Sequence, residues 1–242
     1  MIEVTRETGI VRMTIRRPEK KNALTPDMYN TLSASVDEAG ADSSVHALVI
    51  TGCEGIFTAG NDIDDFRGRA VAESPGPSAG LAFIERLLCC DTPVIAGVEG
   101  PAIGIGTTLL LHCDLVISGD SAVYRTPFTD LGITPEAAST VMGPLWMGLR
   151  RAKQLLVLGE ELDAEAAVDS GLVTHRVDDE EVTGRALSEA RKLTTKSRDA
   201  LRAGKQLMLA PWREQALEAL DREQRVFAER LQSNEVRRNL GV

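Results

Sequence analysis

Two short glycine-containing turns constrain this chain more than any other feature. They are Phe57–Ile63 and Gly100–Gly106, and each follows a strand-like apolar run and opens a helix-like pattern. The first N–H groups of a helix lack a carbonyl partner within it and carry the positive end of its dipole. Two such turns that converge would stabilise the negatively charged oxygen of a reacting carbonyl, such as that of a thioester.

A third segment, Thr134–Ser139, supplies a carboxylate that would move a proton. Glu136 follows Pro135, and the residues after it are mostly apolar. Burial disfavours the charged form of a carboxyl, so we expect the pKa of Glu136 to be raised toward that of a useful base. A structural alternative is that Glu136 is an acid in the first turn of a helix, where it would interact with the helix dipole.

The length and the net charge limit the classes of protein to which this chain can belong. With 242 residues, 43% of them hydrophobic, the chain can form one large domain with a C-terminal appendage. The net charge of -9 excludes a broad basic face for nucleic acid or a membrane surface, so any anionic ligand must be held locally.

Neither a disulfide framework nor a metal site is expected. The four cysteines lie in apolar runs and the three histidines are scattered, without metal-ligand spacing. The N-terminus alternates like a strand rather than a signal peptide, and no apolar run is long enough to span a membrane. We therefore predict a cytoplasmic protein.

Hydrophobic periodicity predicts a β/α core in the first two thirds of the chain. Alternation on both sides of Thr8-Gly9 predicts a hairpin over residues 4–16. Continuous apolar runs predict buried parallel strands, and three- to four-residue spacing predicts helices. The strands are expected over 47–50, 93–98 and 114–118, the helices over 27–39, 81–89 and 106–111, and a surface loop over 69–80.

Beyond residue 149 the pattern is almost wholly helical. Helices are expected over 150–158, 163–170, 180–193, 197–209 and 212–231, with a short strand over 172–177. We divide the chain into a core over residues 1–195 and a C-terminal helical oligomerisation region over residues 196–242. Within that region Leu217, Leu220, Phe227 and Leu231 form an apolar stripe, which favours a contact with the core or with another subunit.

Six motifs follow one another in a fixed order over most of the chain. They are Arg17–Leu24, Phe57–Ile63, Gly100–Gly106, Cys113–Leu115, Thr126–Gly132 and Asp163–Val173. Each is weak alone, but the collinear set resembles the enoyl-CoA hydratase/isomerase (crotonase) superfamily. The resemblance implies an α/β fold, a crotonase-like spiral of β-β-α units with a helical C-terminal region, assembled as a homotrimer or a dimer of trimers.

The resemblance also implies the substrate and the site. The substrate is an acyl-CoA thioester, coenzyme A is part of it, and no separate cofactor is needed. The thioester oxygen accepts hydrogen bonds from the N–H groups of Asn61 and Ile105. The positions expected to line the substrate are Lys20, Ala23, Leu24, Ala59, Gly60, Asp62, Ile63, Gly104, Thr108 and Phe128. The simpler interpretations are a solvated charge for Lys20 and a helix N-terminal acid for Asp62.

Two departures from the family pattern bear on the reaction. Thr108 and Phe128 stand where hydratases of this family carry glutamates, and neither side chain can act as a general base. Glu136 stands where the peroxisomal-type 3,2-enoyl-CoA isomerases place their single catalytic glutamate. The resemblance therefore favours an isomerase. The alternatives are an enoyl-CoA hydratase or other crotonase-type lyase, and a catalytically silent acyl-CoA-binding member.

Overall fold

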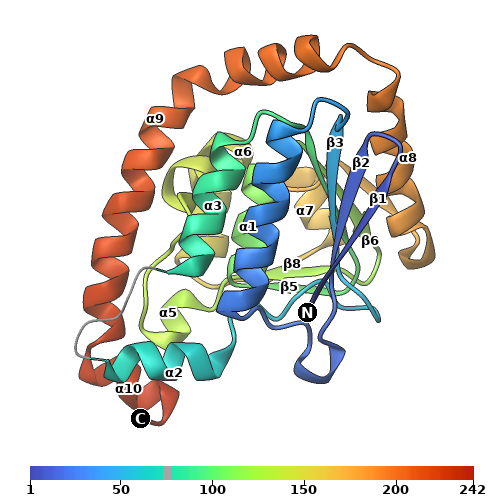
Figure 1. Ribbon diagram of the computed structural model, residues 1–242. Coiled ribbons are helices and arrows are strands. Elements are labelled where there is room, and N and C mark those ends of the chain that lie inside the picture. The colour runs from blue at the N-terminus through green and yellow to red at the C-terminus, as the bar shows by residue number, and fades with distance from the viewer. Residues whose placement is uncertain (73–77) are drawn as a thin grey trace.

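Two sheets form the centre of the computed structural model, which describes residues 1–72 and 78–242. The larger has the strand order β1-β2-β3-β4-β6-β9 and the smaller the order β5-β7-β8. The larger sheet consists of β1 (Ile2–Glu7), β2 (Ile10–Ile15), β3 (Ala47–Thr51), β4 (Val94–Val98), β6 (Leu115–Gly119) and β9 (His175–Val177). The smaller consists of β5 (Pro101–Ile103), β7 (Val123–Arg125) and β8 (Leu162–Asp163), and crosses below the larger one (Figure 1).

The strands of the larger sheet agree with the sequence patterns, whereas the three short strands of the smaller sheet were not predicted. β1 and β2 form the expected antiparallel hairpin, and Gly9 in its turn has a φ of 75°. From β2 onward the neighbours in the larger sheet are parallel, with Leu48 of β3 paired to Val94 of β4. All five residues of β3 and of β4 are buried, which explains their continuous apolar runs.

Helices cover both faces of the larger sheet. On one side lie α1 (Pro26–Ala41), which Thr25 caps, and α3 (Ala79–Cys89), and on the other lies α8 (Val182–Thr194) (Figure 1). The expected helix over 106–111 is a single α-turn, α4 (Ile105–Thr108), continued by the 3-10 helix η2 (Leu109–His112). The other short elements are η1 (Pro18–Lys20), α5 (Phe128–Leu131), α7 (Ala164–Ser170) and η3 (Asp179–Glu181).

Two local expectations were wrong. Residues 69–71 of the expected loop belong to α2 (Ile63–Val71), which begins at the N-cap Asp62, whereas residues 73–77 lie outside the described part of the chain. The helix expected over 150–158 begins much earlier, as α6 (Ser139–Leu156), and Gly148 interrupts it with a φ of 70°. An interrupted helix shifts the angular position of its apolar residues, so its first half is not apparent from periodicity.

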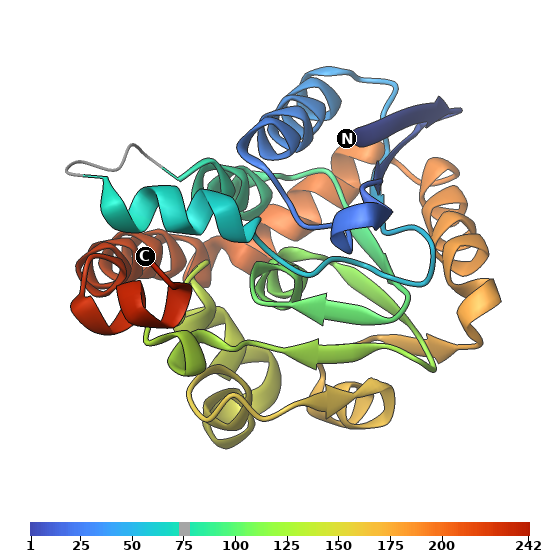
Figure 2. The ribbon, with the colours of Figure 1, turned by 90° about the horizontal axis from the view of Figure 1, so that it is seen from below.

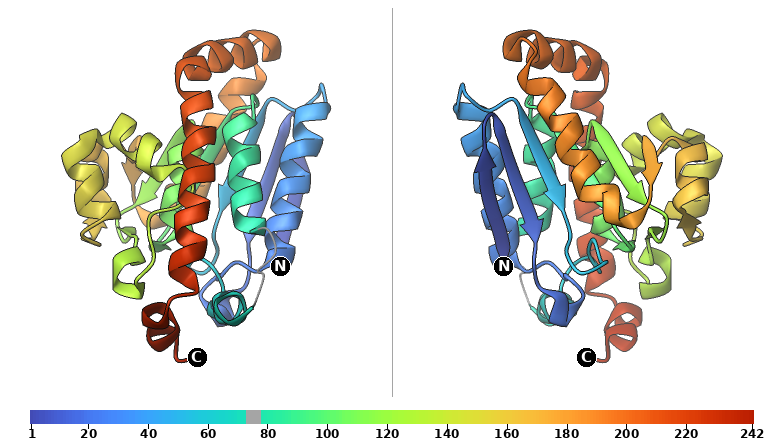
Figure 3. Two further views of the ribbon diagram at one scale, coloured as in Figure 1. Left: turned by 90° about the vertical axis from the view of Figure 1, so that its left-hand side faces the viewer. Right: turned by 90° about the vertical axis from the view of Figure 1, so that its right-hand side faces the viewer.

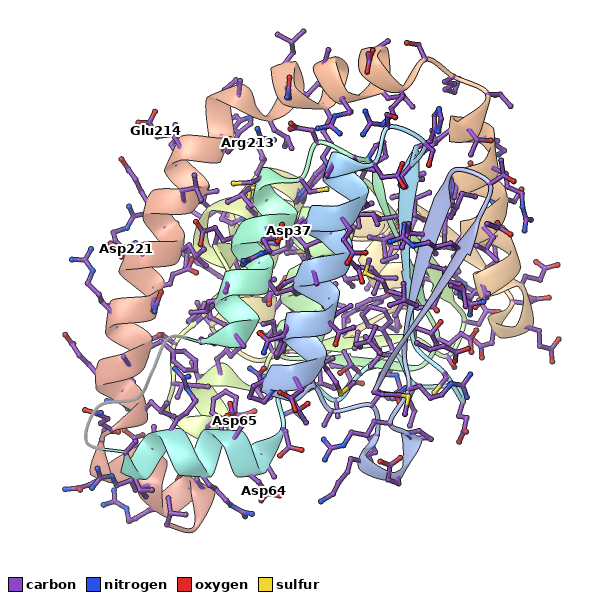
Figure 4. The ribbon with its side chains drawn as sticks, in the orientation of Figure 1. Asp37, Asp64, Asp65, Arg213, Glu214 and Asp221 are labelled. Carbon is purple, nitrogen blue, oxygen red and sulfur yellow. The ribbon has the colours of Figure 1, made fainter. Side chains whose placement is uncertain are left out.

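The C-terminal helices expected over 197–209 and 212–231 form one element, α9 (Arg198–Leu231), followed by α10 (Asn234–Leu240). Pro211 lies inside α9 and cannot donate a helical hydrogen bond, so it favours a bend rather than a break. Arg213 and Glu214, just after it, mark the place where α9 turns down the side of the molecule (Figure 4).

The descending part of α9 packs on its own chain. It runs between α3 and α6 (Figure 3, left), and α10 lies beside α2 (Figure 2). Leu220, Phe227 and Leu231 of the predicted stripe are buried in the main core. The ring of Phe227 meets that of Phe66 edge-on, with 5.9 Å between centroids. This stripe is therefore a contact with the core.

Candidate active site

The two glycine-containing turns lie against each other. The N–H of Thr58 donates to the Pro101 carbonyl (3.0 Å), and the N–H of Ile103 donates to the Thr58 carbonyl (2.9 Å). Gly60 has a φ of +89°, and a Cβ there would lie 2.7 Å from the Ile103 oxygen. A side chain at position 60 would therefore force the two turns apart.

Each turn presents one unpaired N–H group. Leu24 pairs with Gly60 and Asp62, so the N–H of Asn61 between them points away from Leu24. Ile105 is the first residue of α4, so its N–H has no helical partner, and it follows Gly104 with a φ of 58° and a ψ of -122°. No acceptor in residues 1–72 and 78–242 pairs with either N–H.

Two adjoining cavities meet at these turns. The smaller has a volume of about 290 Å³ and the larger about 550 Å³, and Asn61, Phe66 and Glu136 line both. The predicted site residues in the wall of the smaller cavity are Lys20, Ala23, Ala59, Gly60, Asn61, Asp62, Ile63, Gly104, Ile105, Phe128 and Glu136. Leu24 and Thr108 are 1% and 0% exposed and lie behind this wall, so the structure does not place them in contact with a ligand.

Glu136 is the buried carboxyl at the junction of the cavities. It is 3% exposed, and its pKa is raised to about 7, chiefly by burial and then by the nearby Glu223, against the opposing effect of Arg69. Its position is not that of a first-turn acid, because α6 begins only at Ser139, after the N-cap Ala138. The expected direction of the pKa shift is confirmed, and the helix-dipole alternative does not apply.

Asp62, the other acid in the smaller cavity, is already paired. Its carboxylate accepts hydrogen bonds from the Arg17 guanidinium and from the Asp64 N–H, and it caps α2. The bond from Arg17 is the largest cause of the lowered pKa of Asp62. Asp62 therefore supports the turn and is a poor proton acceptor.

The larger cavity is lined by residues that carried no motif. The Tyr29 hydroxyl donates to Asn61 Oδ1 (2.6 Å), and its pKa is raised by burial and by the negative charges of Glu136 and Asp65. Asp65 projects from α2 toward the body of the molecule, whereas Asp64 projects away (Figure 4). Arg69, Gln224 and Phe227 complete the polar and aromatic wall.

These residues were missed for different reasons. Tyr29 lies on the buried stripe of an expected helix, so its burial was predictable, but its contact with Asn61 was not. Asp65 and Arg69 lie on α2, part of which was expected to be a loop. Gln224 and Phe227 come from α9, far along the chain, and no local pattern indicates that they reach this cavity.

Two further findings concern metal-ion binding and membrane-spanning helices. Within residues 1–72 and 78–242, no three His, Cys, Asp or Glu side chains cluster closely enough to hold a metal ion. In the same part of the chain, every helix is too short or too polar to cross a bilayer.

Comparison with known proteins places the chain in a family. The family model described as enoyl-CoA hydratase/isomerase matches residues 5–241. Enoyl-CoA delta isomerase 2 of Rattus norvegicus is 38% identical over 177 residues, which cover 72% of this chain and 45% of that protein. A probable enoyl-CoA hydratase of Mycobacterium leprae is 30% identical over 227 residues, covering 94% and 87%.

The fold gives the same result. The crystal structure of an enoyl-CoA hydratase/isomerase from Pseudoalteromonas atlantica matches with a TM-score of 0.93 and 35% identity, over 99% of this chain and 95% of that one. The chain spans about half the length of enoyl-CoA delta isomerases 2 and 3, which it matches. The expected α/β crotonase fold with its helical C-terminal region is confirmed. The chain belongs to the enoyl-CoA hydratase/isomerase family.

Proposed function

We propose that this chain is a 3,2-enoyl-CoA isomerase with Glu136 as its single general base. The observation that carries the proposal is the position of Glu136, a buried carboxyl with a pKa of about 7 in the wall shared by both cavities. A base with a pKa near the working pH combines a large deprotonated fraction with useful proton affinity. The similarity to the rat delta isomerase supports the same assignment.

The reaction is a proton transfer between two carbons. Glu136 removes a proton from the α carbon of a 3-enoyl thioester, and the electrons move onto the thioester oxygen as a dienolate. The N–H groups of Asn61 and Ile105 stabilise that oxygen, each worth about 3–4 kcal/mol when well placed. Protonated Glu136 then returns the proton to the γ carbon, and the double bond becomes conjugated with the carbonyl. No oxidation state changes, so the step requires no redox cofactor.

The smaller cavity suits the thioester end of the substrate. It contains both unpaired N–H groups, and the exposed Lys20 and Lys21 lie in its wall, where they would contact the phosphates of coenzyme A. The larger cavity begins at Glu136 and would receive the acyl chain beyond the reacting carbons.

A hydratase is the competing assignment, because several relatives carry that name. Hydration requires one group to deprotonate water and a proton source for the α carbon. At the two hydratase positions Thr108 is fully buried behind the wall and Phe128 is apolar. A silent acyl-CoA-binding member would keep the cavities, but it would not need a carboxyl with a raised pKa at their junction.

Parallel isomerase and hydratase assays on short- and long-chain 3-enoyl-CoA and 2-enoyl-CoA test the proposal. We expect the wild type to isomerise 3-enoyl-CoA, and Glu136→Gln to lose activity about a hundredfold or more, with CoA-ester binding little changed. The matched control is Asp64→Asn, which neutralises an acid of α2 that projects away from the molecule (Figure 4) and should retain most activity. Near-wild-type isomerase activity in Glu136→Gln, or hydration by the wild type that outpaces isomerisation, would contradict the assignment.

A further inference from the structure

The turn that follows Glu136 is conformationally strained. Ala137 has a φ of 67° and Ala138 a φ of 55°, so two consecutive residues with side chains adopt the left-handed region. Both are fully buried. Such a conformation persists only where neighbouring groups hold it. The turn begins at Glu136 itself, whose carbonyl accepts from the Ser139 N–H (3.2 Å).

Glu223 of α9 holds one side of this turn. The N-cap of α6 is Ala138, whose methyl group cannot accept a hydrogen bond. In its place Glu223 Oε1 accepts from the Thr140 N–H (2.9 Å) and from the Thr140 hydroxyl, across 83 residues of sequence. Its carboxylate also lies at the positive end of the α6 dipole. The tail helix thus caps the helix that begins beside the proposed base.

His112 holds the other side. Its Nε2 donates to the Ala137 carbonyl (2.8 Å), and the ring is buried. Burial lowers the pKa of His112 to about 4, so the ring is neutral at pH 7 and its single proton lies on Nε2. His112 ends η2, which continues directly from α4, the helix that offers the Ile105 N–H. One strained turn is therefore held between the oxyanion-binding helix and the C-terminal tail.

We propose that Glu223 is a positioning residue for the proton transfer: it fixes the turn that presents Glu136 and places a second negative charge beside it. This inference rests on the proposed function for its catalytic meaning, although the contacts themselves do not depend on it. Because Glu223 belongs to α9, the descending segment of this helix then helps to build the site directly.

The charges around Glu136 and Glu223 decide which of these two carboxyls holds a proton. Burial raises the pKa of both, but Glu223 accepts hydrogen bonds from Thr140 that favour its ionised form. Its Oε2 is buried without a partner in the described residues. The charged and titratable groups that line the cavities with Glu136 are Arg69, which lowers its pKa, and Asp65 on α2, the neutral Tyr29 on α1, and Asp62, Lys20 and Lys21 in the smaller cavity. Of the two carboxyls, Glu136 therefore takes up a proton first.

Two substitutions separate charge from position. Glu223→Gln keeps an oxygen that accepts from Thr140 but removes the charge, so the acid limb of kcat/KM for a 3-enoyl-CoA should move to lower pH by about one unit, the scale of a coupled pair. Glu223→Ala removes the cap, so kcat should fall about a hundredfold with little change in KM. Glu218→Gln, an exposed glutamate on the same helix, is the matched control and should change neither quantity.

Two measurements that do not depend on catalytic turnover accompany the kinetics. Carbon-13 NMR of the Glu136 carboxyl, assigned by its absence in Glu136→Gln, should titrate at lower pH in Glu223→Gln than in the wild type. Hydrogen exchange at the amides of residues 138–140 should be faster in Glu223→Ala and unchanged in Glu223→Gln. If the Glu136 carboxyl titrates at the same pH in Glu223→Gln as in the wild type, the electrostatic role of Glu223 is wrong. If amide exchange in Glu223→Ala equals that of the wild type, the positioning role of Glu223 is wrong. A wild type that isomerises no 3-enoyl-CoA defeats the proposed function, while these two measurements still decide the role of Glu223.

Discussion

Under the proposed function, Glu136 is subject to opposing demands from catalysis and from folding. Proton abstraction would need its carboxylate, yet burial and the neighbouring Glu223 disfavour that charged form. Its pKa rises from an ordinary value of 4.5 to about 7 on folding, so between these pH values the native state binds more protons than the unfolded state. The contribution of Glu136 to the free energy of unfolding therefore falls as pH rises from about 4.5 to about 7, the range over which we expect activity to rise.

Glu136→Gln should accordingly stabilise the protein in a pH-dependent way. At pH 8 the wild type bears a buried charge that glutamine lacks, so the free energy of unfolding should increase by up to about 3 kcal/mol. At pH 4.5 the wild-type side chain is protonated in the native state, and the difference should vanish. Urea unfolding of both proteins at the two pH values measures this, and a stabilisation equal at both would show that charge is not its cause.

At the scale of elements, the start of α4 would supply one half of the proposed oxyanion site. Ile105 would contribute through its backbone, so we expect its side chain to be replaceable and its N–H to be required. Gly106 must remain small, because a Cβ there would lie 2.5 Å from Thr58 Cγ2 in the facing turn.

Ile105→Pro should therefore abolish most turnover. Proline removes the N–H at a first helical position, where the ring is tolerated, and loss of one oxyanion donor typically costs about 100- to 1,000-fold in kcat. Ile105→Val is the control, because it keeps the N–H. Steady-state kinetics with a 3-enoyl-CoA, together with circular dichroism to verify folding, provide the test. A proline variant as active as the valine variant would remove Ile105 from the site.

The descending part of α9 is a second element with a testable role. Phe227 is 7% exposed, contacts Phe66 and lines the larger cavity. Phe227→Ala should lower the free energy of unfolding by about 3–4 kcal/mol through lost contacts and a new void. Val226→Ala, at a neighbouring exposed position, should change it by less than about 0.5 kcal/mol. Chemical denaturation of the two variants compares them, and equal stabilities would show that α9 is not anchored through Phe227.

At the scale of the whole molecule, the tail completes the core rather than projecting from it. Its buried residues form part of the main hydrophobic cluster, so removal of everything after Pro211 should expose that cluster and cause aggregation. The stripe was one reason to expect self-association, and its burial in the chain's own core removes that reason. Self-association stays a prediction from the family resemblance. Other exposed apolar side chains are available to an interface, namely Leu145, Trp146 and Leu149 on α6 and Leu207 and Met208 on α9.

Sedimentation at micromolar concentration tests the assembly. We expect a species of three or six times 26.1 kDa, as the family resemblance implies. Replacing Leu149 by glutamate would then weaken association if α6 forms the contact. A stable monomer across this concentration range would contradict the trimer prediction.

The sequence alone determined the elements whose signals are local. Alternation, apolar runs and turn glycines identified the hairpin, the parallel strands and both glycine-containing turns, because each depends on residues a few positions apart. The direction of the pKa shift of Glu136 was predictable, because its mostly apolar stretch of sequence favours burial.

Only the tertiary structure decided how the base is held. The contacts of Glu223 with Thr140 and of His112 with Ala137 join segments 83 and 25 residues apart, and no sequence period encodes them. The same applies to the place of the α9 stripe, which an amphipathic pattern leaves open between the core and another subunit. Periodicity indicates which side of an element is buried, whereas its partner depends on how all the elements pack together.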